Sequence, residues 1–355
     1  MSAGLQRIAA VGAGRMGRGI ALAFAYAGHQ VALVDIKQRD AAAAARLEQE
    51  SLTEIGSSLA MLASLGMFDT AQVEQILARV RFVGRDGAAA ALAEADTVFE
   101  GVPEVLDAKR EAFDFIGRHA RADATVASTT STILVTELAA FIPGPERLLN
   151  AHWLNPAYIV PLVELSPHPG TDTAVLAGMK ALLERAGKVP VVCAAAPGFI
   201  VPRLQALVMN EAARMVEQGI ASAEEIDKAT RYGFGFRFAA IGVVEFIDFG
   251  GNDILYYASR YLAGQIDAAR FAPPAIVEQF MAEGRNGLKS GRGFHDYQGI
   301  DSDAYRRDVL GRSLGMLRHL DLLQAPGMAL RAGRHQPPEL SRQAAPESAT
   351  QAANG

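Results

Sequence analysis

The chain has 355 residues, of which 50% are hydrophobic and 21% are charged, and its formal net charge is -5. Such a length favours two domains over one simple core, and the composition is globular rather than disordered. The mildly acidic balance argues against nucleic acid as a partner. Cys193 is the only cysteine, which excludes an internal disulfide and a multi-cysteine metal site, and we expect no metal.

The first residues lack the basic and then apolar layout of a signal peptide. No uninterrupted apolar run approaches the roughly 20 residues that a membrane helix needs. We therefore expect a cytoplasmic protein that has no membrane partner and acts on a small molecule.

Short β-rich runs alternate with helical stretches in the first half of the chain. The expected strands are Ile8–Val11, Gln30–Asp35, Val80–Val83, Thr97–Val102, Thr125–Ser128, Leu148–Trp153, Leu162–Leu165 and Val189–Cys193. Ala-rich helical segments lie between them, among them Met16–Ala27, Asp40–Leu65 and Lys109–Ala120. This alternation is typical of a parallel sheet covered by helices.

After Pro197 the strand signal ends and long amphipathic stretches follow. The expected helices are Phe199–Gln218, Ala223–Tyr232, Val243–Leu262, Ala275–Glu283 and Ala304–Leu320. We therefore divide the chain into an α/β domain (residues 1–195) and an all-helical domain (196–324), with a hinge at Ala194–Gly198. The polar, Pro-containing stretch 325–355 predicts a flexible tail.

A G-x-G-x-x-G motif directly follows the first strand and precedes a helix. Gly12 permits a tight turn, Gly14 lets a pyrophosphate approach the backbone, and Gly17 lets helix and strand pack closely. Arg15 and Met16 complete the turn at a helix N-terminus, whose free N–H groups attract phosphates. We expect all five residues to contact a dinucleotide.

Asp35 closes the second strand eighteen residues after Gly17, where a carboxylate accepts ribose hydroxyls. A carboxylate there also repels a 2′-phosphate, which favours NAD over NADP, although Lys37 and Arg39 lie close enough to blunt this preference. Strand, turn, helix, second strand and acid together predict a Rossmann-type dinucleotide-binding domain with NAD as its cofactor.

A second group of polar residues follows the fifth strand. His152 ends one expected strand, and Glu164 lies on the next strand after a Pro-containing turn. Adjacent strands would bring the imidazole and the carboxylate together, and such a carboxylate fixes the tautomer and stabilises the imidazolium. Oxidation of an alcohol by NAD needs a base for the hydroxyl proton, and His152 is the natural candidate.

These motifs resemble the 3-hydroxyacyl-CoA dehydrogenase family over residues 6–300. The resemblance lies in Ser128–Thr132, His152 with Asn155 and Pro156, Leu162–Glu164, Glu100 with Glu104 and Lys109, Pro197–Ile200 and Gly287–Phe294. It implies that His152 and Glu164 form a catalytic dyad, that Ser131 bonds the substrate oxygen, and that Asn155 positions substrate and nicotinamide. It also implies that Glu104 and Lys109 contact the cofactor, and that the helical domain forms a homodimer.

Several of these residues also have a plainer interpretation. Ser131 is suited to cap a helix that starts near Ile133, and Asn155 is ordinary turn chemistry before a proline. Lys109 is alternatively a solvated charge on a helix. His168, between two prolines, is expected to be a loop residue.

Three departures from the family pattern concern the substrate. Pro202 stands where the family has an asparagine, so one active-site hydrogen bond is missing, although a proline is tolerated in the first turn of a helix. No Lys, Arg or His occurs between Arg46 and Arg79, where CoA-using members carry basic residues.

The third departure is the stretch Gly233–Gly242, which reads Gly-x-Gly-x-Arg-x-Ala-x-x-Gly. It is similar to non-CoA members of the family such as L-gulonate 3-dehydrogenase (lambda-crystallin) and carnitine dehydrogenase. Arg237 is suited to grip a substrate carboxylate in a bidentate manner, or alternatively to form an ion pair at a subunit interface.

We therefore favour an NAD-dependent oxidoreductase that interconverts a small β-hydroxy acid, or a similar secondary alcohol, and its ketone. A short-chain 3-hydroxyacyl-CoA dehydrogenase is the second hypothesis. A non-catalytic NAD-binding structural protein is the third, although such a protein would have no chemical reason to carry the full set of catalytic residues.

Overall fold

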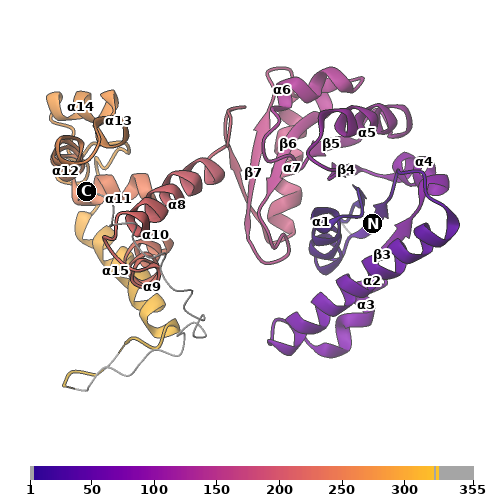
Figure 1. Ribbon diagram of the computed structural model, residues 1–355, viewed down its shortest axis with the longest axis horizontal. Coiled ribbons are helices and arrows are strands. Elements are labelled where there is room, and N and C mark those ends of the chain that lie inside the picture. Colours follow the sequence, from indigo (N-terminus) through magenta and orange to yellow (C-terminus); the bar gives the residue numbers. More distant parts are fainter. Residues whose placement is uncertain (1–3, 324, 328–355) are drawn as a thin grey trace, which may run out of the picture. The chain divides into compact units, whose positions relative to one another are not determined.

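The computed structural model describes residues 4–323 and 325–327. The chain forms two compact units, Met1–Glu211 and Ala212–Gly355, each of which is described by itself (Figure 1). Nearly all of the predicted tail, 325–355, lies outside the described residues, and the hinge at Ala194–Gly198 stays a prediction.

One eight-stranded sheet forms the centre of the first unit, in the order β3-β2-β1-β4-β5-β6-β7-β8. The strands are β1 (Arg7–Val11), β2 (Gln30–Val34), β3 (Val80–Val83), β4 (Thr97–Glu100), β5 (Thr125–Ser128), β6 (Leu148–Trp153), β7 (Leu162–Pro167) and β8 (Val189–Val192). All eight predicted strands are present. The order reverses between β1 and β4, and ligands of such sheets bind outside the carboxyl ends of the strands at this point.

The prediction of a parallel sheet is wrong for its last two strands. The strands from β3 to β6 run parallel, but β7 is antiparallel to β6, and β8 is parallel to β7. The reason is the connection between β6 and β7, residues 154–161, which is too short for a helical crossover and instead closes a hairpin.

Helices cover both faces of the sheet. They are α1 (Arg15–Tyr26), α2 (Ala41–Ser64), α3 (Val73–Leu77), α4 (Arg85–Glu94), α5 (Leu106–His119), α6 (Val135–Leu138) and α7 (Thr173–Arg185), with short 3₁₀ turns at Thr70–Gln72, Ala139–Phe141 and Pro145–Arg147. The next helix, α8 (Val201–Glu217), contributes no residue to either core cluster. The helices α1, α2, α3 and α7 pack in one core cluster, and α4, α5 and α6 in the other. The helices α3, α4 and α7 were not among the predicted elements.

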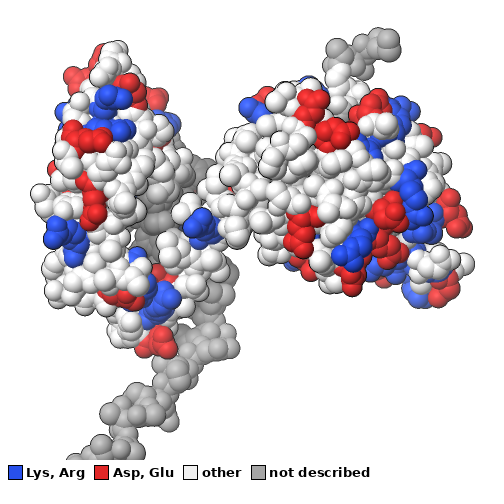
Figure 2. All heavy atoms as spheres, turned by 90° about the horizontal axis from the view of Figure 1, so that it is seen from above, with Lys and Arg blue, Asp and Glu red and all other residues white. Residues whose placement is uncertain are grey.

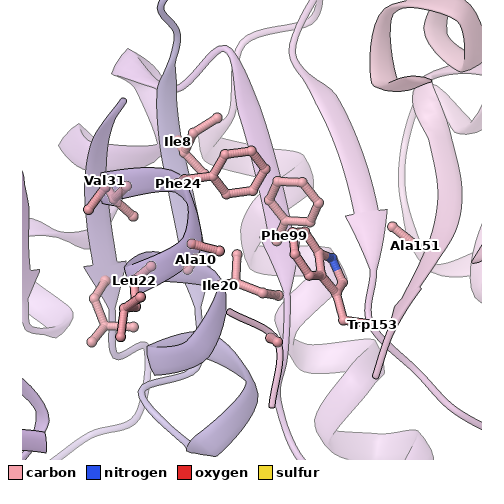
Figure 3. Close-up of a cluster of buried hydrophobic side chains, with 14 of the residues drawn as sticks. Ile8, Ala10, Ile20, Leu22, Phe24, Val31, Phe99, Ala151 and Trp153 are labelled. Carbon is pink, nitrogen blue, oxygen red and sulfur yellow. The ribbon is translucent and has the colours of Figure 1, made fainter. Parts of the chain in front are cut away.

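An aromatic cluster packs around the carboxyl end of β6. The ring centroid of Trp153 lies 5.7 Å from that of Phe24 on α1 and 5.9 Å from that of Phe99 on β4 (Figure 3). All three side chains are almost fully buried. Because Trp153 directly follows His152, its packing anchors the part of the strand that carries the imidazole.

The described part of the second unit is helical, as predicted. It contains α9 (Ala223–Ala229), α10 (Phe236–Ala240), α11 (Val243–Gly250), α12 (Asn252–Gln265), α13 (Ala268–Phe271), α14 (Ala275–Ala282) and α15 (Ser302–His319), with a π-helical turn at Thr230–Gly235. The single helix expected over Val243–Leu262 is wrong. Gly251 separates α11 from α12 with φ +108°, a conformation that favours glycine.

The glycine-rich stretch Gly287–Phe294 has a structural partner in Asp248 of α11. This buried carboxylate accepts the backbone N–H groups of Phe294 (2.9 Å) and His295 (2.7 Å). A Cβ on Gly293 would lie 1.9 Å from its Oδ1 atom, so only glycine fits this close approach. The stretch is therefore fixed against α11 within the helical unit.

Acidic and basic side chains are interspersed on the face drawn in Figure 2, consistent with the small net charge. None of the helices in the described ranges has the length and apolar character required to span a membrane.

Candidate active site

The glycine turn lies where the strand order reverses. Gly12 has φ +102°, and a Cβ there would lie 2.7 Å from the carbonyl oxygen of Gly101, the residue after β4. A Cβ on Gly17 would lie 1.9 Å from the carbonyl oxygen of Gly12, whereas one on Gly14 would meet nothing within 4 Å. The first and third glycines are thus required by the packing of the turn, and the second leaves space for a ligand to approach the backbone.

The helix that follows this turn begins without a side-chain cap. Gly14 is the N-cap of α1, so the N–H groups of the first turn keep their capacity to bond an anion. Arg15 is exposed and bonds no residue that the structure describes, while Met16 packs against the core. The residues present fit the pyrophosphate of a dinucleotide.

Asp35 follows β2 beside this turn. Its side chain is 8% exposed, and Arg39 donates its Nε–H to the carboxylate oxygen Oδ2. The carboxyl end of β2 therefore carries Asp35, the acid expected to accept the ribose hydroxyls. It also carries Arg39, the cation expected to weaken the preference for NAD over NADP.

His152 and Glu164 form a buried pair across the hairpin. They are direct partners in the β6–β7 register, and Nδ1 of the imidazole lies 2.8 Å from Oε2 of the carboxylate. The side chains are 4% and 0% exposed. When Nδ1 carries its proton and donates it to Glu164, Nε2 is left with a lone pair that can accept a proton.

The other oxygen of Glu164 faces the start of α8. Oε1 accepts the backbone N–H groups of Ile200 (2.9 Å) and Val201 (2.8 Å), at the positive end of that helix. Pro202 follows as the second residue of α8, the position in which a missing N–H costs little. The buried carboxylate is thus compensated by N–H donors without a lysine or an arginine.

Phe199 covers one face of the imidazole. The rings of Phe199 and His152 are stacked with centroids 5.1 Å apart, and Phe199 is 5% exposed with φ +44°. A bulky residue in the left-handed region is strained, and such strain concentrates at functional sites. Phe199, Ile200 and Val201 were not predicted as partners of His152 and Glu164, although the predicted hinge directly precedes them.

Glu104 joins the Ser131 loop to Lys109. Its Oε1 accepts the N–H groups of Ser131 (3.0 Å) and Thr132 (2.9 Å), and Thr130 donates its hydroxyl to the same atom. Partial burial acts to raise the pKa of Glu104, but the Thr130 hydroxyl, the Lys109 charge and Thr132 outweigh it and hold this pKa at about 2. Glu104 is therefore a carboxylate that fixes the loop on which Ser131 lies.

Lys109 is 1% exposed and lies between two carboxylates. Its Nζ is 3.0 Å from Oε1 of Glu100 and 3.3 Å from Oε2 of Glu104. The alternative of a solvated helix charge is therefore wrong, because α5 turns this residue towards the sheet. Burial raises the pKa of Glu100, even though Lys109 and a hydroxyl from Ser128 act to lower it.

The capping alternative for Ser131 is also wrong. The helix after it begins at Val135 with Leu134 as its N-cap and no side-chain cap, while Ser131 is exposed. His168 is a satisfied loop residue, as expected, since its two ring nitrogens bond the carbonyl of Pro145 and the N–H of Gly170.

A pocket of about 320 Å³ opens between α1, α2 and the β6–β7 loop. Its lining includes Arg15, Arg18, Glu54, Ile55, Ser58, Asn155 and Tyr158. Asn155 is exposed, and its peptide bond to Pro156 is cis. Arg18 pairs with Glu54 across the pocket, so α2 contributes a carboxylate and a hydroxyl to the wall rather than a free cation.

Arg237 lies in the second unit, on α10. It is exposed, and its guanidinium carbon is 5.8 Å from the ring centroid of Phe246. Its guanidinium has no ion-pair partner among the described residues. The charge is thus available to an outside group.

Lys188 was not singled out from the sequence, yet it holds the loop on which Asn155 lies. It is 8% exposed, and its Nζ donates to the carbonyl oxygens of Ala157 (2.7 Å) and Val160 (2.9 Å). Burial lowers the pKa of Lys188. The buried ammonium thus ties the start of β8 to the tip of the β6–β7 hairpin.

Replacement Lys188→Met is expected to lower the free energy of unfolding by about 3 kcal/mol, because two buried carbonyls lose a charged donor. Urea unfolding measures this change. The control Lys180→Met removes the same charge from α7, where the described residues offer it no partner, and is expected to stay within about 0.5 kcal/mol of the parent. Equal effects of the two substitutions would contradict the role of Lys188.

The fold and the site define a Rossmann-type dehydrogenase. A family model described as 3-hydroxyacyl-CoA dehydrogenase, NAD binding domain, matches residues 7–196, and one described as 3-hydroxyacyl-CoA dehydrogenase, C-terminal domain, matches residues 198–297. The chain belongs to the 3-hydroxyacyl-CoA dehydrogenase family, whose members are NAD-dependent oxidoreductases acting on CH–OH groups.

Its relatives differ in substrate. The 5-formyl-3-hydroxy-2-methylpyridine 4-carboxylate 5-dehydrogenase of Mesorhizobium japonicum is 30% identical over 89% of this chain and 99% of its own length. The lambda-crystallin homolog of Rattus norvegicus is 34% identical over 72% of this chain and 77% of its own. The crystal structure of a 3-hydroxyacyl-CoA dehydrogenase from Archaeoglobus fulgidus is 30% identical, covers 90% of this chain and 100% of its own, and has a TM-score of 0.70.

Proposed function

We propose that the protein is an NAD-dependent dehydrogenase for a small β-hydroxy acid, or a similar secondary alcohol, that is not attached to CoA. The observation that carries the chemistry is the buried His152–Glu164 pair. Nδ1 of the imidazole lies 2.8 Å from Oε2 of the carboxylate, so Nε2 is left free to accept a proton. Family membership supports the reaction type. The named relatives include both CoA and non-CoA enzymes, so we infer the substrate class from the residues that line the pocket.

In this proposal His152 accepts the substrate's hydroxyl proton at Nε2, and Glu164 stabilises the resulting imidazolium through Nδ1. NAD, when bound, supplies the hydride acceptor. The N–H groups of Ile200 and Val201 hold the Glu164 side chain in place through its other oxygen, and Phe199 excludes water from one ring face. Ser131 donates a hydrogen bond to the reacting oxygen, and Asn155 orients the substrate.

The wall of the pocket supports a substrate without CoA. Glu54 and Ser58 of α2 line it. Of the two α1 arginines in the lining, Arg18 is already paired with Glu54, which leaves Arg15 as the one unpaired cation among the described lining residues. A multiply phosphorylated nucleotide needs several free cations, and a carboxylate in the wall repels it. A small acid with a single charge avoids this cost.

Arg237 is proposed to hold that charge. Arg237→Met is expected to raise KM for free hydroxy acids by at least about tenfold while the KM of a neutral secondary alcohol stays nearly constant, because only the acid loses a bidentate ion pair. Steady-state kinetics with matched acid and alcohol substrates measures the difference. A similar rise for both would indicate instead that Arg237 acts in a subunit interface.

The alternative is a short-chain 3-hydroxyacyl-CoA dehydrogenase, which the name of the Archaeoglobus structure favours. The deciding experiment compares reduction of acetoacetyl-CoA with that of a panel of free keto acids, followed by NADH absorbance. Efficient turnover of the free acids supports the proposal, and turnover of the CoA ester alone overturns it. A non-catalytic NAD-binding protein is disfavoured by the intact dyad.

We further propose that residues 1–195 bind NAD and that the helical domain, 196–324, binds substrate and forms a cytoplasmic homodimer. Exposed apolar side chains on α8 and α12 support the dimer, among them Leu207 (62% exposed), Met209 (67%), Tyr257 (64%) and Tyr261 (68%). Sedimentation equilibrium tests the oligomeric state.

A further inference from the structure

The ribose end of the cofactor site carries an ion pair that no general feature of the fold requires. Gly12 donates its N–H to the carbonyl of Val34 (2.8 Å), so Asp35, the next residue, lies beside the glycine turn. Arg39 donates its Nε–H to Asp35, and its side chain is 31% exposed. The carboxylate that would meet the ribose therefore already has a positive partner at the surface.

This pair changes the charge that a ribose meets. An isolated carboxylate at this position repels a 2′-phosphate, whereas a nearby arginine accommodates one. The two Nη groups of Arg39 bond no other described residue. The backbone N–H of the exposed Lys37 donates to Oδ1 of Asp35 (3.4 Å), while its side-chain ammonium has no partner among the described residues.

The second carboxylate of the same loop is engaged elsewhere. Asp40 is the N-cap of α2 and accepts the N–H of Ala43 at 2.7 Å. Asp35 is consequently the one acid of the loop that faces the ribose end, against the two cations Lys37 and Arg39. The balance at this end favours an additional anion.

We propose that this end of the site accepts a 2′-phosphorylated ribose as well as a ribose diol, so that the protein binds NADP(H) in addition to NAD(H), with Arg39 as the discriminating residue. With the diol, Asp35 accepts a hydroxyl. With the phosphate, the Nη groups of Arg39 donate to the phosphate oxygens while Nε keeps its bond to Asp35, because the planar guanidinium can bridge two anions.

Fluorescence titration of the full chain with NADH and with NADPH tests this inference without any substrate, so it stands or falls separately from the proposed reaction. NADPH is expected to bind with a Kd within about 100-fold of that of NADH. Arg39→Gln is expected to weaken NADPH by at least about tenfold and NADH by less than about threefold, since only the phosphate loses a charge-assisted donor.

Arg81→Gln is the matched control, because it removes an exposed arginine from the neighbouring strand β3, where its partner is Glu94. Both Kd values are expected to stay unchanged in this variant. The inference is overturned if the Kd for NADPH exceeds that for NADH by more than about 100-fold, or if Arg39→Gln weakens both cofactors by the same factor. Loss of NADH binding in Arg39→Gln also overturns it, since Arg39 would then serve only to hold Asp35.

Discussion

Substitution His152→Ala is expected to lower kcat by about 1,000-fold while the Kd for NADH stays within about twofold of the parent value. The imidazole is the proposed acceptor of the substrate proton, and the dinucleotide turn at Gly12–Gly17 does not include it. Steady-state turnover and NADH titration on the same preparation measure the two effects.

The control for this variant is His119→Ala. His119 lies in the last turn of α5, which runs back from the carboxyl ends of the strands to their amino ends, so it lies at the opposite edge of the sheet from the dyad. Its turnover is expected to match that of the parent. Full activity in His152→Ala would sink the assignment of the dyad, whereas loss of both turnover and NADH binding would point to a structural role.

Substitution Gly17→Ala is expected to weaken NADH binding by about 100-fold and to lower the free energy of unfolding by about 2 kcal/mol. The reason is a Cβ that would lie 1.9 Å from the carbonyl oxygen of Gly12, so the turn itself has to move. NADH titration and urea unfolding measure the two quantities.

Gly14→Ala separates the two causes, because a Cβ at Gly14 meets nothing within 4 Å. We expect this variant to lose NADH affinity and to keep its stability. Gly178→Ala on α7, where a Cβ also meets nothing, is expected to preserve NADH affinity and to raise the free energy of unfolding by up to about 1 kcal/mol, because alanine is the better helix former. If Gly17→Ala bound NADH as the parent does, the glycine turn would not be the phosphate site.

The dinucleotide motif and the His152–Glu164 pair could be predicted from sequence because their requirements are local. The run of Gly12, Gly14 and Gly17 between a strand and a helix, with Asp35 after the next strand, is a local pattern whose physical requirements are met within about 30 residues. His152 and Glu164 were also found from sequence, because the Pro-containing connection between their strands is short enough to make them neighbours.

Tertiary structure decided what each of these groups touches. The direction of β7 followed from hairpin closure, which the alternation of strands and helices did not reveal. The second oxygen of Glu164 is satisfied by the N-terminus of α8, some 36 residues further along the chain, and Phe199 reaches His152 only through a left-handed backbone. Such contacts depend on long-range packing and leave no periodic pattern in the sequence.

The partners of the buried charged residues were likewise decided by the tertiary structure. The sequence by itself determined the fold class, the dinucleotide motif, the pairing of His152 with Glu164 and the family, since these rest on spacing along one segment. Only the tertiary structure decided that Lys109 is buried between Glu100 and Glu104, and that the buried Lys188 holds the β6–β7 loop. The physical reason is that spacing along the chain specifies neighbours within one turn or hairpin, whereas the partner of a charge is chosen by which distant elements the core brings into contact.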